Sequence, residues 1–368
     1  MLEIRNVHKT FNPGTINEKH ALNGVNLKLE EGDFVTVIGG NGAGKSTMLN
    51  AVAGTWPVDD GSILIDGVDV TGLPEFKRAS FLGRVFQDPM TGTTATMQID
   101  ENLALAARRG KRRGLGWGIT KAEKERFHEL LKELDLGLED RMTSKVGLLS
   151  GGQRQAVTLL MASLQKPKVL LLDEPFAAID AKIRQELRSW LKEMIGKLGI
   201  TSIFVTHDQD EAIEVADEII ITNAGRIEQK GTPIGVYRNP ETAFTASFFG
   251  QPSVLKNADD FHTFAQAEGA DKIIVRPEFV KISKLDEVEK FKTSVSRGVV
   301  ERVSFRGDNL ELQVRVNNSV VTARRSLEKA DIREGETVNV FLYRIFALRG
   351  DSVQLIENEA VRDDFVII

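Results

Sequence analysis

The sequence predicts an α/β domain with a mostly parallel sheet, followed by a smaller domain of antiparallel strands. Up to about residue 240, short β-branched runs alternate with helical patterns, which is typical of parallel strands joined by helices. The runs at 168–175 and 201–208 are continuously apolar and end in polar residues, as buried parallel strands do. From about residue 241, alternating strands are separated by turn signals, which predicts a small β-barrel over 241–368.

Composition limits the class of protein. A chain of 368 residues exceeds the usual size of one hydrophobic core, so the length predicts two domains, 1–240 and 241–368. A net charge of -5 argues against nucleic acid as the main partner. The absence of cysteine excludes disulfides and thiolate metal sites, which suits a reducing cytoplasm. No apolar run approaches the length of a membrane span, so we expect none.

The stretch "GGNGAGKST" at 39–47 is the first motif that carries chemistry. It follows a β-branched run and precedes a helical pattern, the context of a phosphate-binding loop. Glycines let backbone N–H groups curve around a phosphate, Lys45 reaches its oxygens, and Ser46 offers a hydroxyl to Mg²⁺. The alternative is a glycine-rich turn that has this spacing by chance. We assign the nucleotide contacts to Gly39, Asn41, Gly42, Gly44, Lys45, Ser46 and Thr47.

Two carboxylates follow the apolar run at 169–172. Asp173 ends the predicted strand and Glu174 lies just beyond it. In an ATPase with a phosphate-binding loop, the first carboxylate holds the magnesium shell and the second polarises the attacking water. The alternative is a strand that ends in two solvated acids. We therefore predict Asp173 as a metal residue and Glu174 as the catalytic base.

Two further helices are predicted by their caps. Residues 119–137 open with Thr120 and Glu123 at capping-box spacing, and four apolar side chains share one face: Phe127, Leu130, Leu131 and Leu134. The stretch "LLSGGQRQAVTLLMA" at 148–162 places Ser150 and Gln153 at the same spacing. A capped helix needs no glycines after the cap, yet Gly151 and Gly152 stand there. Bare N–H groups, the helix dipole and the Ser150 hydroxyl together predict a second anion site.

With this stretch, the chain resembles the family of ATP-binding cassette (ABC) ATPases. The resemblance implies that two copies pair head to tail. Ser150, Gly151, Gly152 and Gln153 of one copy would then close over the ATP phosphate held by the other. ATP and Mg²⁺ are the implied cofactors, hydrolysis to ADP and phosphate is the implied reaction, and a second copy of the chain is the implied partner.

Other family elements follow in order. Gln87 in "VFQDP" matches the glutamine loop, which touches magnesium and the attacking water. His207 matches the switch histidine that bridges Glu174 and the γ-phosphate, and Asp180 matches a loop that crosses the dimer interface. Phe11 matches an aromatic residue that stacks on adenine, although a core role is equally natural. The basic run 108–113 is interpreted as a solvated loop, with contact to lipid or a membrane subunit as the alternative.

The two parts of the chain resemble different importers. Residues 1–173 look like ATPases of putative uptake systems of the tryptophan-import type, whereas residues 174–368 look like ATPases of sulfate/thiosulfate importers. The former usually carry His-Thr where this chain has Pro175 and Phe176. We therefore interpret the chain as a recombinant or engineered chimera joined near 173–178. The tail resembles the oligonucleotide-binding-like regulatory domain of importer ATPases.

The resemblance implies a cytoplasmic ATPase subunit, peripheral at the inner face of the cell membrane, that drives solute uptake through separate permease subunits. These would contact Gln87 and a helical subdomain at about 90–150. A soluble ABC ATPase acting on nucleic acid is the alternative, but the 63 residues from Gln87 to Ser150 leave no room for its long coiled coil. A nucleotide-binding module without turnover is disfavoured by the presence of both Glu174 and His207.

Overall fold

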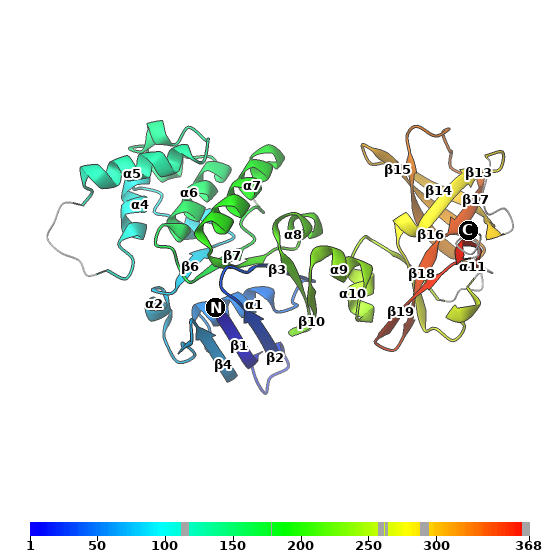
Figure 1. Ribbon diagram of the computed structural model, residues 1–368, viewed down its shortest axis with the longest axis horizontal. Helices are drawn as coiled ribbons and strands as arrows, with labels where there is room; N and C mark the ends of the chain where they lie inside the picture. Colours follow the sequence, from blue (N-terminus) through cyan, green and yellow to red (C-terminus); the bar gives the residue numbers. More distant parts are fainter. Residues whose placement is uncertain (112–117, 178, 257–260, 262–263, 288–293, 363–368) are drawn as a thin grey trace. The chain divides into compact units, whose positions relative to one another are not determined.

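The computed structural model describes residues 1–111, 118–177, 179–256, 261, 264–287 and 294–362 (Figure 1). The chain divides into two compact units, Met1–Pro233 and Ile234–Ile368.

The structure describes only part of the basic run 108–113, since Arg112 and Arg113 lie outside the described residues. The interpretation of this run as a solvated loop is wrong at Arg108. Its guanidinium donates to the carboxylate of Glu123 at 3.1 Å and to the carbonyl oxygen of Ala104 at 2.9 Å.

The central sheet of the first unit has six strands in the order β10-β9-β3-β8-β7-β6 (Figure 1). Their bounds are β3 Phe34–Gly39, β6 Leu82–Val85, β7 Val169–Asp173, β8 Thr201–Val205, β9 Glu218–Asn223 and β10 Arg226–Gly231. Every pair is parallel except β9 with β10. The predicted strands at 168–175 and 201–208 are confirmed as β7 and β8, which are neighbours. Their carboxyl ends therefore meet at one edge of the sheet.

A second, antiparallel sheet in the first unit was not expected from the sequence. Its order is β2-β1-β4-β5, formed by β1 Leu2–Phe11, β2 Lys19–Leu29, β4 Asp60–Ile65 and β5 Val68–Asp69. Apolar residues of β1, β2 and β4 share one buried cluster with helix α1 (Lys45–Ala53) and with β3. This sheet therefore packs beside the loop that connects β3 to α1.

Helices complete the first unit. The predicted helix at 119–137 is confirmed as α5 (Lys121–Lys132), with the Thr120–Glu123 capping box present. The stretch at 148–162 forms α6 (Gly151–Ser163), and α4 (Ile99–Ala107) and α7 (Ala181–Leu198) pack with these helices and the sheet in one hydrophobic cluster. The shorter elements are α2 Glu75–Arg78, α3 Pro89–Gly92, η1 Glu139–Arg141, η2 Val146–Leu148 and α8 Gln209–Val215. Among the described residues, no helix combines the length and the apolar character that crossing a membrane requires.

The second unit has two antiparallel sheets around one apolar core. One sheet contains β11 Ser253–Leu255, β12 Lys272–Val275, β18 Arg344–Arg349 and β19 Ser352–Glu357. The other contains β13 Val280–Lys284, β17 Thr337–Leu342, β14 Ser296–Phe305, β15 Asn309–Val316 and β16 Ser319–Ser326. The alternation predicted for Leu310, Leu312, Val314 and Val316 is present in β15, where the last three are buried and Leu310 is half-buried. The remaining elements are α9 Pro233–Arg238, which crosses the division, α10 Ala243–Phe248, η3 Ala265–Ala267, η4 Pro277–Phe279 and α11 Glu359–Arg362.

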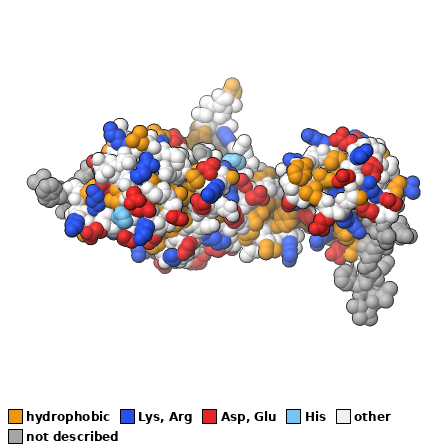
Figure 2. All heavy atoms as spheres, turned by 90° about the horizontal axis from the view of Figure 1, so that it is seen from above, with side chains coloured by type: hydrophobic (Ala, Val, Ile, Leu, Met, Phe, Trp, Pro, Cys, Tyr) orange, Lys and Arg blue, Asp and Glu red, His pale blue; other side chains and the backbone are white. Residues whose placement is uncertain are grey.

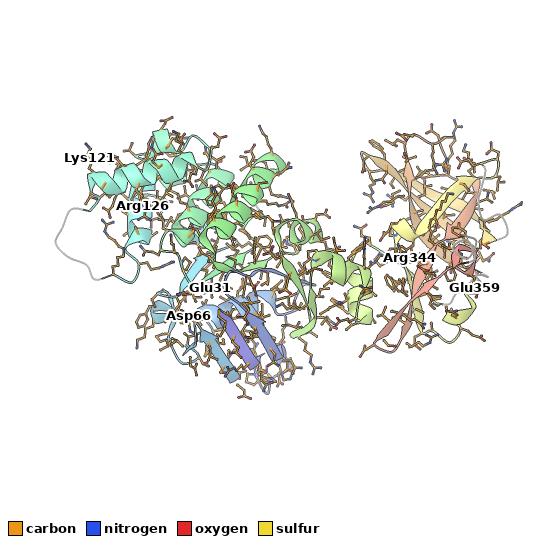
Figure 3. All side chains as sticks on the ribbon, in the orientation of Figure 1. Glu31, Asp66, Lys121, Arg126, Arg344 and Glu359 are labelled. Atoms are coloured by element: carbon orange, nitrogen blue, oxygen red, sulfur yellow. The ribbon has the colours of Figure 1, made fainter. Side chains whose placement is uncertain are left out.

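Charges of both signs are mixed on the surface. On the face drawn in Figure 2, the described Lys and Arg side chains alternate with Asp and Glu rather than forming a continuous basic stripe. Figure 3 shows the same pattern along α5, where Lys121 and Arg126 project from a helix that also carries several acidic residues. A backbone-tracking nucleic-acid site is built from clustered cations, and this face does not offer that arrangement.

Candidate nucleotide-binding site

The loop between β3 and α1 is held closed by its own lysine. Lys45 Nζ donates to the carbonyl oxygens of Gly39 at 2.8 Å and Gly40 at 3.2 Å, and the residue is only 8% exposed. Burial lowers the pKa of Lys45, while the carboxylates of Glu174 and Asp173 act to raise it. The ammonium group is therefore a desolvated cation beside two acids, where its attraction for a phosphate is little screened by water.

Two glycines of the loop are required by close backbone contacts. A Cβ on Gly39 would lie 2.2 Å from the carbonyl oxygen of Thr222 in β9. Gly44 has φ of 100° and precedes the first residue of α1, and a Cβ there would lie 2.4 Å from the carbonyl oxygen of Ala21. Backbone atoms cannot move away as a side chain can, so only glycine fits at both positions. Asn41, Gly42 and Ser46 are exposed, and Thr47 is half-buried.

Asp173 faces the start of α1. It is the last residue of β7, and the hydroxyl of Ser46 donates to its Oδ1 across 3.4 Å. Burial raises the pKa of the Asp173 carboxyl, while the Arg84 guanidinium and the Ser46 hydroxyl act to lower it. A hydroxyl and a half-buried carboxylate are hard oxygen donors, the kind Mg²⁺ prefers. The residues present therefore fit a magnesium ion that is completed by phosphate oxygens and water.

Glu174 is held from two sides. Gln87 Nε2 donates to Glu174 Oε2 at 2.9 Å, and His207 Nδ1 lies 3.2 Å from Glu174 Oε1. The three residues follow the ends of β6, β7 and β8, which are adjacent strands, so the sheet itself brings them together. Glu174 has φ of 43° and its N–H donates to the carbonyl of Val205 at 2.9 Å. The carboxylate is thus fixed in direction while remaining 18% exposed.

The start of α6 is built as the sequence predicts. Ser150 Oγ accepts from the N–H of Gln153 at 3.3 Å, and Gln153 Oε1 accepts from the N–H of Ser150 at 3.3 Å, which confirms the capping box. Ser150 and Gly151 are exposed, whereas Gly152 is buried against Ile183 of α7. Among the described residues, no hydrogen bond or ion pair joins residues 150–153 to the loop 39–47. In the described part of the chain, side-chain contacts link Ser46 to Asp173 and Glu174 to Gln87 and His207, whereas none links residues 150–153 to the loop.

Asp180 and Phe11 have local partners. Asp180 caps α7, with Oδ1 accepting from the N–H of Ile183 at 3.1 Å. The ring of Phe11 meets Trp56 edge-on at 5.0 Å between ring centroids, and Lys9 Nζ lies 5.7 Å from its ring centre. Phe11 is half-buried at the end of β1, so one part of its ring remains open to solvent.

Two cations of the site were missed from the sequence. Arg84 of β6 bonds Asn50 at 2.7 Å and Thr55 at 2.9 Å, and it acts electrostatically on Asp173. Lys19 begins β2, and a Cβ on Gly42 would lie 3.1 Å from its Nζ. No motif marks either residue. The pairing of strands brings these residues to the site. In one example, β1 pairs with β2 so that Lys19 lies opposite Phe11.

Comparison with known proteins gives this geometry a family. The family described as "ABC transporter" matches residues 22–177, and the family described as "TOBE domain" matches residues 273–342. The chain is 36% identical over 331 residues to the spermidine/putrescine import ATP-binding protein PotA of Spiroplasma citri, covering 86% of this chain and 88% of that protein. It is 38% identical over 335 residues to the sulfate/thiosulfate import ATP-binding protein CysA of Synechocystis, covering 89% and 88%. The chain belongs to the ABC transporter family.

Solved structures support the same assignment. A dimeric, post-hydrolysis ATP-binding cassette named MJ0796, bound to ADP and Pi, superposes with a TM-score of 0.56 at 32% identity, covering 63% of this chain and 99% of that one. The ADP conformation of the cassette MJ1267 superposes with the same TM-score at 26% identity, covering 65% of this chain and 95% of the other. The first unit is therefore an ABC cassette and an ATPase, and the second carries a TOBE domain whose curled sheets fit the predicted barrel.

Proposed function

We propose that this chain is the ATP-hydrolysing subunit of an importer and that Glu174 is the base that polarises the attacking water. The observation that carries the proposal is the clamp on Glu174, whose two oxygens are engaged by Gln87 and His207. A general base needs a fixed direction and access to the substrate, and this carboxylate is held at both oxygens while 18% of it stays exposed. Asp173 instead accepts a hydrogen bond from the Ser46 hydroxyl, so we assign separate tasks to the two acids.

The phosphate-loop residues divide the remaining work. Lys45 and the loop N–H groups bind the phosphates, and Ser46, Asp173 and Gln87 hold Mg²⁺. When bound, the ion neutralises charge that develops on the phosphate oxygens. His207 fixes Glu174 and reaches toward the γ-phosphate, and Phe11 stacks on adenine with the part of its ring that Trp56 leaves open.

A second copy of the chain completes the site. Ser150, Gly151 and Gln153 lie at the N-terminus of α6, where bare N–H groups and the helix dipole favour an anion. Because no described contact brings them to the loop 39–47 of the same chain, we assign them to the ATP of the partner copy, together with Asp180. The dimeric form reported for MJ0796 supports this arrangement.

Permease subunits are the proposed membrane partners, which would place the chain at the inner face of the membrane. A cavity of ≈ 530 Å³ lies between the sheet and the helical segment, lined in part by Arg84, Phe86, Leu105 and Arg109. Its position beside Gln87, one residue after Phe86, supports contact between the permease and the catalytic clamp. If the permease displaced Gln87, the position of the Glu174 carboxylate would change with it, because the two side chains are hydrogen-bonded.

We propose sulfate or thiosulfate as the solute, following the relatives named as sulfate/thiosulfate import proteins. Other relatives of similar identity are named for spermidine/putrescine. An anion and a polyamine are recognised by different permeases, so complementation of uptake mutants of each kind separates the two solutes. Growth rescue only in the polyamine mutant would reject sulfate.

The join proposed near 173–178 stays a prediction. The relatives named above match across it, since they cover 86% and 89% of this chain. Residues on either side pack in one cluster, in which Leu170 and Leu172 join Phe176 and Leu187. Phe176 also meets Phe204 of β8 at 5.8 Å between ring centroids. Whatever its origin, the segment is part of one continuous core, so the chemistry of Asp173 and Glu174 does not depend on the join.

The substitution Glu174→Gln tests the base. We expect ATP binding to be retained, because no phosphate contact is removed, and steady turnover to fall by roughly a thousandfold or more. Nucleotide-bound dimers should accumulate, as seen by light scattering with ATP. Glu186→Gln, an exposed change on α7, is the matched control and should hydrolyse ATP normally. Undiminished phosphate release by Glu174→Gln would reject the assignment.

A further inference from the structure

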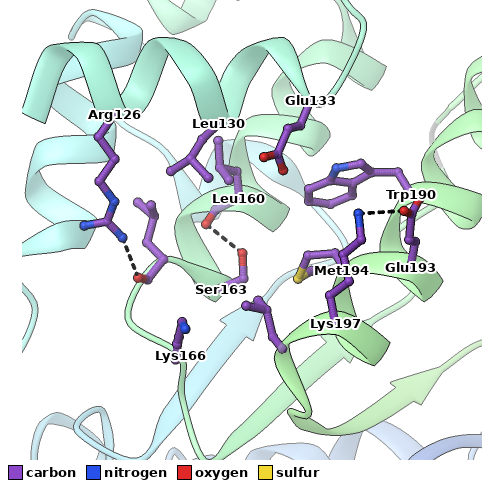
Figure 4. Close-up of a pocket in the computed structure, with 12 residues that line it drawn as sticks. Arg126, Leu130, Glu133, Leu160, Ser163, Lys166, Trp190, Glu193, Met194 and Lys197 are labelled. Carbon is purple, nitrogen blue, oxygen red and sulfur yellow. Dashed lines mark hydrogen bonds and ion pairs between the residues drawn. The ribbon is translucent and has the colours of Figure 1, made fainter.

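A groove separate from the nucleotide site lies between α5, α6 and α7. Its volume is ≈ 570 Å³, within the roughly 300–1,000 Å³ typical of small-molecule sites. Figure 4 shows side chains from the three helices surrounding it. None of its lining residues belongs to the predicted nucleotide site.

The floor of the groove is the uncovered part of a wide apolar face on α7. One row of that face, Leu187, Leu191 and Ile195, is buried in the core. A second row, each member four residues after the last, remains half-buried: Trp190, Met194 and Leu198. Leu130 of α5 and Leu160 of α6 line the opposite side. A helix buries such a row against a neighbour when it can, so these side chains present unfilled apolar surface.

Charges at one end of the groove satisfy each other. Lys197 Nζ pairs with Glu193 Oε1 at 2.6 Å on the exposed side of α7. Glu193 is the main cause that raises the pKa of Lys197, and the Glu133 carboxylate of α5 adds to it. Glu133, Trp190, Glu193 and Lys197 lie together in Figure 4. Among the described residues that line this end, no cation is therefore left unpaired to hold an anionic ligand.

The other end has two cations without an acid. Arg126 of α5 reaches only the carbonyl oxygen of Leu164, 3.5 Å from its Nη2. Lys166 follows α6 and is exposed. Within the described ranges, neither Arg126 nor Lys166 forms an ion pair. Both lie on the same side of the groove in Figure 4, at the end away from Lys197 and Glu193.

We propose that this groove binds a small amphipathic anion, with a flat aromatic body over Trp190 and Met194 and a carboxylate or sulfonate between Arg126 and Lys166. The apolar floor and the one-sided pair of cations are complementary to such a ligand. A planar ring matches the indole of Trp190, since offset stacking adds to the area that is buried. A wholly apolar ligand would leave both cations unused.

The probe for the test is 8-anilinonaphthalene-1-sulfonate, titrated into the full chain in the presence of saturating ADP. We expect saturable fluorescence at one site, with energy transfer from Trp190 that Trp190→Phe removes. In the double variant Arg126→Glu/Lys166→Glu, the dissociation constant should rise about tenfold, because two attractions become repulsions. The neutral analogue N-phenyl-1-naphthylamine should bind more weakly than the sulfonate and should not respond to the double variant.

Lys121→Glu/Lys132→Glu is the matched control. It makes the same change in net charge with two residues of α5, and neither of them lines the groove. The control should bind the sulfonate as the unmodified chain does, and both double variants should keep the thermal unfolding midpoint of the parent. Equal weakening in both double variants would overturn the proposal. So would the absence of a saturable site while ADP is saturating, or a neutral analogue that binds as tightly as the sulfonate.

Discussion

The two surfaces proposed to bind ATP phosphates differ in how complete they are. Around Lys45 the site is assembled within one chain, with the lysine buried, Asp173 facing Ser46, and Glu174 held by Gln87 and His207. At the start of α6, Ser150 and Gly151 are exposed, and the Ser150 hydroxyl caps its own helix. At the first surface, the groups proposed for catalysis already contact one another. The other offers only an anion-attracting end.

The difference teaches where control of an ATPase can reside. The lysine is buried and both acids are held by neighbouring side chains, so the association of two copies need not rearrange them. The N-terminus of α6 is capped within its own chain, so it needs no ligand to be stable. It contributes to the reaction only when a phosphate is brought to it. If that phosphate belongs to a partner copy, association of the copies becomes the step that turns chemistry on.

Mixing two inactive variants gives the largest expected effect. Lys45→Ala removes the buried cation from one surface, and Gly151→Asp places a carboxylate on the other. An acidic residue in the first turn suits a helix, so the second variant should fold normally. Each alone should lose ATP turnover by roughly a hundredfold or more. An equal mixture should recover about a quarter of the parent's phosphate release, because a head-to-tail heterodimer keeps one intact site.

The control for this mixture is either inactive variant mixed with itself, and dimer formation is followed by light scattering. If both surfaces acted on ATP within one chain, heterodimers would contain no intact site and turnover would stay at the level of the single variants. If heterodimers form and no activity is recovered, the proposal that the start of α6 acts on the ATP of the partner copy is wrong.

Alanine at the glycines of the two surfaces should give unequal losses of stability. Gly39→Ala drives a Cβ to 2.2 Å from a backbone oxygen, and we expect a loss in unfolding free energy of about 3 kcal/mol. At Gly152 the new Cβ would meet side-chain methyl groups rather than backbone, the Cγ2 atoms of Ile183 at 2.8 Å and of Ile179 at 3.3 Å, so a small shift in side-chain packing has to admit it. Alanine also favours a helix by about 1 kcal/mol, so this variant should stay within about 1 kcal/mol of the parent. Urea unfolding of both variants checks the difference, and equal losses would contradict it.

The sequence predicted most of this site because its groups follow strand ends and helix starts. Gln87, Glu174 and His207 stand just after three apolar runs, and parallel strands bring such positions to one edge. The capping boxes of α5 and α6 could be read from Thr120–Glu123 and Ser150–Gln153, since they depend on local spacing alone.

Features that depend on long-range pairing could not be predicted in this way. The antiparallel sheet of β1, β2, β4 and β5 was missed because its strands are separated by the phosphate-binding loop and α1. Arg84 and Lys19 were missed for the same reason, since only the folded sheets place them near Asp173 and Gly42. The groove above Trp190 depends on how three helices pack, which the apolar pattern of one helix does not reveal.

The smallest expected effect is on the stability of the folded chain and concerns Asp173. A buried carboxylate is unfavourable, so we expect Asp173 to lower the free energy of unfolding when no cation is bound. Burial raises the pKa of this carboxyl above its ordinary value, so the folded chain holds the proton more tightly than the unfolded chain. Its contribution to stability is therefore present at low pH and is lost as pH rises from about 3.8 through the folded-state pKa. Asp173→Asn should raise the unfolding free energy at pH 7 by roughly 0.5 kcal/mol, a figure discounted for solvent screening. Urea unfolding without Mg²⁺ or nucleotide measures this gain, and it should vanish near pH 3. The same variant should hydrolyse ATP poorly if Asp173 holds the metal as proposed. A variant that is less stable than the parent at pH 7 would contradict the predicted cost of burying this carboxylate.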